Sequence, residues 1–210
     1  MIRILIADDH AIMREGLKQL FALEPGIEVV AEAANGADVL AALRETPIDL
    51  LLLDMSMSGI SGVDLIAHSR AHRPALPILV LSMHSEIHFV RYTLKAGAAG
   101  YLTKDNDPQT LLAAIRRVAA GGRFIDPLLA EHMVFDAVEP REGLPHERLS
   151  AREFAIFRLL ARGRSVNEIA AEFAISNKTV STHKARLMDK LNCRNNAQLV
   201  RYAVSHRLID

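Results

Sequence analysis

The chain has 210 residues, with 25 Lys or Arg and 25 Asp or Glu, so its formal net charge is zero. Over the whole chain this balance argues against a basic nucleic-acid binder and against an acidic disordered chain. The single cysteine, Cys193, excludes an intrachain disulfide and a cysteine-rich zinc site. No apolar run reaches the roughly 20 residues of a membrane-spanning helix, and the N-terminus lacks a signal-peptide pattern. We therefore expect a cytoplasmic protein.

Short apolar runs alternate with amphipathic helical patterns as far as residue 122. Continuous apolar strands that alternate with helices indicate a parallel sheet covered on both faces. Right-handed crossovers then give a doubly wound (βα)5 α/β fold of the flavodoxin-like kind. The predicted strands are Ile2–Ala7, Ile27–Ala31, Leu50–Leu53, Ile78–Leu81 and Gly100–Leu102. The predicted helices are Ala11–Leu23, Ala37–Leu43, Val63–His72, Ile87–Lys95 and Pro108–Ala120.

The rest of the chain has a different pattern. Residues 123–147 contain Pro127, Pro140, Gly143 and Pro145, which is typical of a linker, with room for a short helix at Leu128–Phe135. Residues 148–210 are wholly helical and predict a small all-α domain of four helices. These helices are Arg152–Arg162, Ser165–Phe173, Asn177–Leu191 and Asn195–His206.

Charge is distributed unevenly over these three segments. Residues 1–122 hold 11 basic and 14 acidic residues, and residues 123–147 hold 2 and 6, so together they carry −7. Residues 148–210 hold 12 basic and 5 acidic residues, which gives +7. The basic domain has the electrostatic character of a nucleic-acid binder, and we expect the acidic part to rest against it and mask it.

Polar residues follow four of the five predicted strands. In an open parallel sheet the C-terminal ends of the strands form the ligand crevice, so Asp8, Asp9 and Asp54 should converge there and repel one another. A hard cation such as Mg²⁺ relieves this repulsion, Lys104 suits phosphate oxygens, and an Asp carboxylate can be a nucleophile. A single Asp at a strand end is more often a helix cap. The set, which includes Ser82, predicts phosphoryl chemistry with Mg²⁺.

Residues 1–122 resemble the receiver domain of bacterial response regulators. The motifs that carry the resemblance are Ile6-Ala7-Asp8-Asp9-His10, Leu53-Asp54-Met55-Ser56-Met57, Ser82 and Gly100-Tyr101-Leu102-Thr103-Lys104-Asp105. The resemblance implies that Asp54 accepts phosphate from the phosphohistidine of a sensor histidine kinase. It also implies that Asp9, Asp54 and the Ser56 carbonyl ligate Mg²⁺, with Asp8 acting through water.

The same resemblance implies a switch. Ser82 moves to hydrogen-bond the phosphoryl group, Tyr101 follows inward, and Lys104 pairs with a phosphate oxygen. By position alone, Tyr101 is also typical of an aromatic residue in any half-buried strand. For His10, His84 and His88 we expect surface or local packing roles.

The sequence departs from the family at one position, where Ser58 replaces the usual Pro. This leaves the rigidity of that loop open. In this family the positions of Ser56 and His84 tune the lifetime of the acyl phosphate, and the sequence does not give the direction.

Two predicted helices of the basic domain are joined by Ala174-Ile175-Ser176, and Ser176 is a good N-cap for the second. On a helical wheel Val180, Leu187 and Leu191 face inward. The opposite, small and polar face suits the major groove, while cations beside it suit phosphates. The candidate DNA contacts are Lys178, Thr179, Ser181, Thr182, Lys184, Ala185 and Arg186. The alternative is an ordinary solvated helix face.

Residues 148–210 resemble the LuxR-type helix-turn-helix, and the two domains together resemble the NarL/FixJ class of response regulators. The matching motifs are Leu149-Ser150-Ala151-Arg152-Glu153, Gly163, Glu168-Ile169-Ala170, Ser176-Asn177-Lys178-Thr179-Val180-Ser181-Thr182-His183 and Lys190-Leu191. Ser181 stands where the class usually has Lys, so contacts of that Lys are not carried over. The resemblance implies a homodimer on promoter DNA with Leu199, Val200 and Tyr202 at its contact. The alternative is that these three residues form intradomain core.

The hypothesis is therefore a phosphorylation-dependent DNA-binding transcriptional regulator of a two-component system. It would catalyse only its own phosphotransfer and dephosphorylation. Two alternatives stay open at this stage. One is an aspartyl-phosphate phosphotransferase or phosphatase acting on a small metabolite, which leaves the basic domain unexplained. The other is a binding module whose receiver is only a dimer scaffold.

Overall fold

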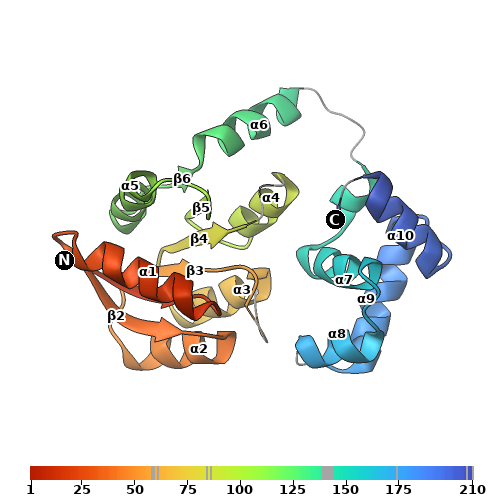
Figure 1. Cartoon of the computed structure of the whole chain (residues 1–210), viewed down its shortest axis with the longest axis horizontal. Coiled ribbons are helices and arrows are strands. Elements are labelled where there is room, and N and C mark those ends of the chain that lie inside the picture. Colours follow the sequence, from red (N-terminus) through yellow and green to blue (C-terminus); the bar gives the residue numbers. More distant parts are fainter. Residues whose placement is uncertain are drawn as a thin grey trace. The chain divides into compact units, whose positions relative to one another are not determined.

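The structure is a computed structural model that describes residues 1–57, 60, 62–83, 85, 87–138, 144–173, 175–206 and 208–209. The chain divides into two compact units, Met1–Phe135 and Asp136–Asp210 (Figure 1). No helix among the described residues is long and apolar enough to cross a membrane.

In the first unit, strands and helices alternate along the chain. The strands are β1 (Ile2–Ala7), β2 (Ile27–Ala33), β3 (Leu50–Leu53), β4 (Ile78–Ser82), β5 (Gly100–Thr103) and β6 (Phe124–Ile125). The helices are α1 (Ala11–Ala22), α2 (Gly36–Glu45), α3 (Gly62–His72), α4 (Ile87–Lys95), α5 (Pro108–Ala119) and α6 (Pro127–Val138).

The strands form one parallel sheet in the order β2-β1-β3-β4-β5-β6. This confirms the doubly wound α/β fold predicted from the sequence. The strand order reverses between β1 and β3, which is where such folds bind ligands. In the register of this pair Ala7 lies opposite Leu53, so the residues that follow them, Asp8 and Asp54, emerge side by side.

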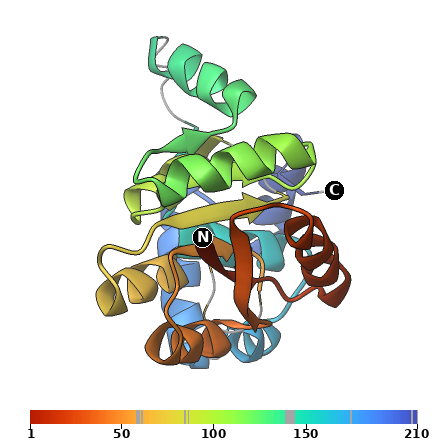
Figure 2. The same ribbon diagram turned by 90° about the vertical axis from the view of Figure 1, so that its left-hand side faces the viewer.

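Both faces of the sheet are buried, which explains why the strands are continuously apolar. Ile4 and Leu50 point to the face covered by α1 and α5, where Phe21 and Ile115 pack. The alternate residues point to the face covered by α2, α3 and α4. The helices flank the sheet in this way in both views (Figures 1 and 2).

The predicted linker segment, 123–147, contains β6 and α6. Strand β6 extends the sheet beside β5, with Phe124 opposite Gly100 and Ile125 opposite Tyr101. Gly100 permits this approach, because a Cβ there would lie 2.8 Å from the Phe124 carbonyl oxygen. Helix α6 includes the whole of the predicted Leu128–Phe135 helix and is longer than it at both ends.

The second unit is helical throughout its described residues. A short 3-10 turn, η1 (Pro145–Arg148), leads into α7 (Ala151–Ala161), α8 (Val166–Glu172), α9 (Asn177–Lys190) and α10 (Asn196–Ser205). The four helices match the four predicted ones. Helices α7 and α8 each begin with a capping box, Ser150 with Glu153 and Ser165 with Glu168, which satisfies backbone N–H groups at both helix starts.

Candidate functional site

An acidic centre lies where β1 and β3 end. Asp8 and Asp54 are each only 2% exposed, and the backbone holds both in place. The Asp54 N–H donates to the Ala7 carbonyl at 2.8 Å, and the Asp8 N–H donates to the Ala33 carbonyl at 3.1 Å. Two carboxylates that lie 46 positions apart in the sequence are thereby fixed next to each other in a buried place.

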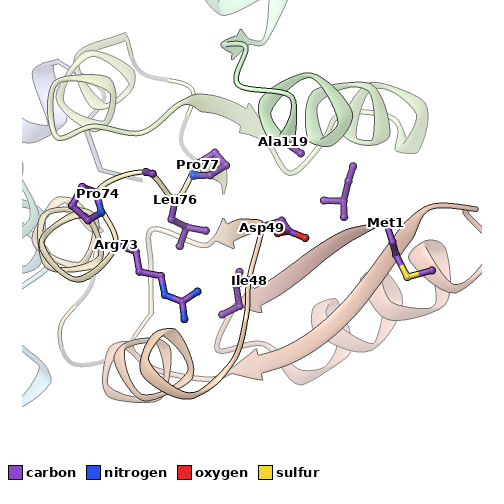
Figure 3. A pocket seen from close by; sticks show the side chains of 10 residues that line it. Met1, Ile48, Asp49, Arg73, Pro74, Leu76, Pro77 and Ala119 are labelled. Carbon is purple, nitrogen blue, oxygen red and sulfur yellow. The ribbon is translucent and has the colours of Figure 1, made fainter.

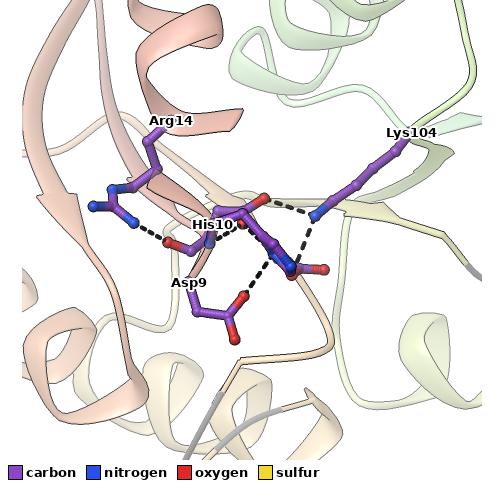
Figure 4. A network of polar contacts seen from close by, with 6 residues as sticks. Asp9, His10, Arg14 and Lys104 are labelled. Atoms are coloured by element: carbon purple, nitrogen blue, oxygen red, sulfur yellow. Dashed lines mark hydrogen bonds and ion pairs between the residues drawn. The ribbon is translucent and has the colours of Figure 1, made fainter. Parts of the chain in front are cut away.

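Lys104 supplies the positive charge of this centre. It directly follows β5, where its backbone N–H donates to the Ser82 carbonyl at 2.8 Å. Its side chain, 7% exposed, extends back so that Nζ donates to Asp8 Oδ2 at 2.7 Å and lies 3.2 Å from Asp54 Oδ2 (Figure 4). Such a pair of contacts in a buried place favours the charged ammonium.

The pKa values of the centre follow from this geometry. Burial raises the pKa of the Asp54 carboxyl; the Lys104 charge opposes the rise and the Asp8 carboxylate adds to it. For Lys104, burial lowers the pKa, but the hydrogen bond to Asp8 and the charges of both carboxylates outweigh it and raise the pKa overall. The ammonium therefore stays charged, while burial and the Asp8 carboxylate disfavour the charged form of Asp54, which a further cation would stabilise.

The donor set fits Mg²⁺. Asp8, Asp9, His10 and Asp54 each offer one ligand atom, and these atoms all lie within 4.8 Å of one another. Among the described residues, neither carboxylate oxygen of Asp54 has a partner in hydrogen-bond geometry, although Oδ2 faces the Lys104 ammonium. Clustered carboxylate oxygens are the ligands that Mg²⁺ prefers.

His10 has a side chain that is 70% exposed and contacts its sequence neighbours, which agrees with the expected surface or local role. Its Nδ1 lies 2.9 Å from Asp9 Oδ1 and 3.3 Å from Asp8 Oδ1 (Figure 4), and its backbone N–H donates to Asp8 Oδ1 at 2.8 Å. The sequence did not predict that its ring would lie among the candidate ligand atoms of the acidic centre. The one signal was its position directly after Asp8-Asp9, before the start of α1.

The predicted switch residues Ser82 and Tyr101 lie on β4 and β5, which follow β3 in the order of the sheet. Ser82 ends β4 and is fully buried, and Thr103 lies opposite it in the register of β4 and β5. Tyr101 is fully buried in the core on the α4 side of the sheet. Ser56, with an exposed side chain, lies in the turn after Asp54. Ser58 and His84 lie outside the described residues, and the side chain of His88 does too.

A pocket of about 610 Å³ lies at the N-terminal ends of the strands, where β1, β3 and β4 begin (Figure 3). Its lining includes Ile48, Asp49, Leu76 and Pro77. Asp49 is held there by Arg3, whose Nε and Nη2 donate to its two carboxylate oxygens at 2.9 and 2.8 Å. The pocket is therefore separate from the acidic centre, which lies at the other ends of the same strands.

The second unit presents a candidate nucleic-acid interface on α9. Ser176 caps this helix, since its Oγ accepts from the Thr179 N–H at 3.1 Å. Val180, Leu187 and Leu191 are buried, as the helical wheel predicted. Opposite them, Lys178, Thr179, Ser181, Thr182, Ala185 and Arg186 are exposed and Lys184 is half-buried. The side of α9 that faces solvent is thus the small, polar and basic one.

Comparison with known proteins assigns both units. The response regulator receiver domain model matches residues 4–116, and the model of the luxR family of bacterial regulatory proteins matches residues 147–203. The chain belongs to the response regulator family. It is 35% identical over 211 residues to the response regulator UvrY of Escherichia coli (strain K12), which covers 100% of this chain and 97% of UvrY.

Solved structures of response regulators are similar over nearly the whole chain. One is RcsB from Salmonella enterica serovar Typhimurium bound to promoter rprA with the phosphomimetic BeF3-, with TM-score 0.69, 28% identity, and 96% and 97% of the two chains covered. Another shows two RcsB dimers bound to two parallel DNAs, with TM-score 0.61, 28% identity, and 97% and 98% coverage. RcsB therefore binds DNA, and in the second structure it does so as a dimer.

The protein is thus a two-component response regulator with a LuxR-type DNA-binding domain, a transcriptional regulator phosphorylated on aspartate. Membership of this family implies a histidine kinase as its partner. It is not a classical enzyme, and the small-metabolite alternative also left the second unit without a role.

Part of the predicted dimer contact needs correction. Leu199 of this response regulator is fully buried inside its own unit, so it offers no surface to a second copy and belongs to the intradomain core. Tyr202 is also engaged within the unit, because its Oη lies 2.9 Å from His146 Nδ1 and its ring stacks on His206. Val200 is half-buried, whereas Val204 on the same helix is 59% exposed.

Proposed function

We propose that Asp54 is the phosphorylated aspartate and that a sensor histidine kinase is the phosphodonor. The observation that carries this proposal is the buried Lys104 ammonium, 2.7 Å from Asp8 and 3.2 Å from Asp54. An Asp54 oxygen attacks the phosphorus of the phosphohistidine, the P–N bond breaks, and an acyl phosphate forms. The phosphoryl group carries about 1.5 to 2 negative charges where the Asp54 carboxylate carried one, and it would face the Lys104 ammonium. We assign to Ser82, at the end of β4, the donation of its hydroxyl to this group.

Asp8, Asp9, Asp54 and the Ser56 carbonyl are the residues that we propose hold Mg²⁺. When bound, the ion supplies positive charge to the phosphoryl oxygens and offsets the repulsion among the carboxylates. The chain itself aligns the nucleophile: backbone hydrogen bonds fix Asp54 beside Asp8, and Lys104 orients one carboxylate oxygen.

The first experiment incubates the full chain with a small-molecule phosphodonor and Mg²⁺ and measures acid-labile phosphate. Asp54→Asn is expected to abolish incorporation, because the amide is not a nucleophile for this step. The matched control is Asp105→Asn, which removes an exposed carboxylate next to Lys104 and should leave incorporation in place. Phosphate that persists in Asp54→Asn contradicts the assignment.

We further propose that residues 148–210 form the DNA-binding domain and that the exposed face of α9 enters the major groove of promoter DNA. Lys178, Lys184 and Arg186 are assigned to phosphates, and Thr179 adds a contact near the helix start. Ser181, Thr182 and Ala185 are assigned to base edges. The support is the burial of the opposite face and the +7 charge of residues 148–210.

Substitution separates these two classes of contact. Lys184→Ala should weaken binding about equally for all sequences and reduce the salt-dependence slope by about 1, whereas Thr182→Ala should change the selected sequence. Selection of DNA from a random pool, followed by titration at several salt concentrations, measures both. Lys95→Ala, which removes an exposed lysine from α4, is the charge-matched control. The assignment fails if Lys184→Ala and Lys95→Ala behave alike.

We also propose a homodimer on DNA that is formed through α10. The proposed contact includes Val200 and the exposed Val204, and it excludes the buried Leu199. A cytoplasmic location stays a prediction that agrees with the family.

A further inference from the structure

Asp126 lies between β6 and α6 and is only 6% exposed. Its two carboxylate oxygens serve different parts of the first unit. Oδ2 accepts a hydrogen bond from the Asn106 side-chain amide and lies 3.4 Å from the Thr103 hydroxyl, which donates to it. Oδ1 accepts from the backbone N–H of Leu128 at 2.9 Å, in the first turn of α6. One buried side chain therefore joins the loop after β5 to the start of α6.

The loop side of this junction is the segment that carries the phosphoryl-site lysine. Thr103 and Asn106 bracket Lys104, and the Asn106 amide donates to the Thr103 hydroxyl at 2.7 Å. The Lys104 ammonium contacts Asp8 and Asp54 at the acidic centre. Within the four residues 103–106, the Lys104 side chain thus contacts the acidic centre, and the side chains of Thr103 and Asn106 contact Asp126.

The helix side of the junction is the point where the chain leaves the receiver. Asp126 has the N-cap position of α6: its carbonyl accepts from the Ala130 N–H at 2.9 Å, and Pro127 follows, as is favourable at a helix start. The Asp126 N–H donates to the Tyr101 carbonyl at 3.1 Å, and Leu129 is buried in the same core cluster as Tyr101. Helix α6 then runs on across the limit between the two units.

We propose that Asp126, through Asn106 and Thr103, couples the position of Lys104 to the docking of α6 and so conveys phosphorylation toward the DNA-binding unit. This inference rests on the proposed function, in which Lys104 pairs with a phosphoryl group on Asp54. The added negative charge draws the ammonium and its short loop toward the phosphoryl group. The loop cannot shift without changing the hydrogen bonds of Thr103 and Asn106 to Asp126. Asp126 then releases or reorients the first turn of α6.

Three variants separate coupling from capping. Asn106→Ala removes the loop partner and leaves the α6 cap in place. Asp126→Ser keeps a good N-cap residue but is too short, and has too few oxygens, to hold Asn106 as well. The matched control is Asp107→Ala, which removes an exposed Asp cap from α5, where Asp107 accepts from the Thr110 N–H at 2.9 Å. This control loses a cap one residue beyond Asn106 without touching Asp126.

The full chain and each variant are treated with a small-molecule phosphodonor and Mg²⁺. Three quantities are measured: acid-labile phosphate, affinity for the selected DNA, and hydrogen exchange of the backbone N–H groups in residues 128–131. Phosphorylation should raise the DNA affinity of the unmodified chain and of Asp107→Ala by roughly 5- to 150-fold, the usual range of coupling between sites. It should also change exchange in residues 128–131. In Asn106→Ala and Asp126→Ser the gain should fall below about twofold and the exchange change should vanish, with phosphate incorporation retained.

Other outcomes overturn the proposal at identifiable points. If the unmodified chain takes up no phosphate, the proposed function fails, and the coupling fails with it. If the chain is phosphorylated and gains DNA affinity but Asn106→Ala and Asp126→Ser gain it equally, only the coupling fails. Loss of the response in Asp107→Ala as well would show that any weakened cap has this effect, which also overturns the role of Asp126.

Discussion

The two units of this response regulator use charge in opposite ways. In the receiver, Asp8, Asp54 and Lys104 are buried within a few ångströms of one another, and their charges shift the pKa values of Asp54 and Lys104. In the helical unit the excess of cations lies on exposed surfaces such as that of α9. The buried charges act on the reactivity of a single carboxylate. The exposed cations are distributed over a surface, where they can contact successive phosphates of DNA.

The comparison is tested most strongly by removing the buried cation. Lys104→Met leaves the Asp8 and Asp54 carboxylates facing each other without the lysine charge, and removal of one member of a buried ion pair typically costs about 3–5 kcal/mol. We expect a loss of that size in the free energy of unfolding at pH 7, measured with urea. Lys95→Met, at an exposed site, should change it little. The loss should shrink when Asp54→Asn is added, since one repelling charge is gone. A loss that is equal for both lysine variants would show that burial confers no special role.

The helical unit should instead depend on a buried group that stays neutral. Burial, with the His206 charge adding to it, lowers the pKa of His146 to about 4, below its unfolded value near 6.5. Neutral His146 stabilises the fold fully above pH 6.5, and this contribution is lost as the pH falls through that value toward 4. Between pH 7 and pH 5.5 the free energy of unfolding should therefore drop by about 1 kcal/mol.

Urea unfolding of the isolated segment 136–210 at these two pH values measures this drop, in a window where carboxylates titrate little. His146→Gln should flatten the pH dependence, because Gln does not titrate. In the full chain, His146→Gln is then compared with His72→Gln, a control at an exposed position on α3. An unchanged slope in His146→Gln would mean that the histidine is not the titrating group.

The smallest expected effect concerns electrostatic attraction between the acidic receiver and the basic residues 148–210. If the acidic receiver masks the basic domain, the isolated segment 148–210 should bind DNA about two- to threefold more tightly than the unphosphorylated full chain at low salt. The difference should fade above about 0.15 M salt, where the screening length is near 8 Å. Fluorescence anisotropy with labelled DNA measures it. Equal affinities at low salt would mean that the charges balance without interacting.

Much of this arrangement could be predicted from the sequence because parallel strands end at a common edge. The apolar runs located β1, β3, β4 and β5, and the polar residues after each run then had to converge. The helices of the second unit were also predicted from their apolar spacing, and Ser176 marked the start of α9.

What could not be predicted depends on contacts between distant residues. Strand β6 has two residues, too few to show a periodicity, and it exists because Gly100 lets Phe124 approach β5. The contacts of His10 with Asp8 and Asp9 depend on the direction of its ring, which no spacing rule gives. For Leu199 the sequence left both a dimer contact and the intradomain core open, and only its burial in the folded unit decided between them.

The Arg3–Asp49 pair has a consequence for the direction of signalling. It joins β1 to the start of β3, at the ends of the strands far from the acidic centre, through three hydrogen bonds from Arg3 to the Asp49 carboxylate. At the other edge the backbone of Asp54 is fastened to that of Ala7. The two strands that present the carboxylates are thus tied at both ends and form a fixed base. We therefore expect displacement after phosphorylation to travel outward through β4 and β5, toward the side of the sheet where α6 begins.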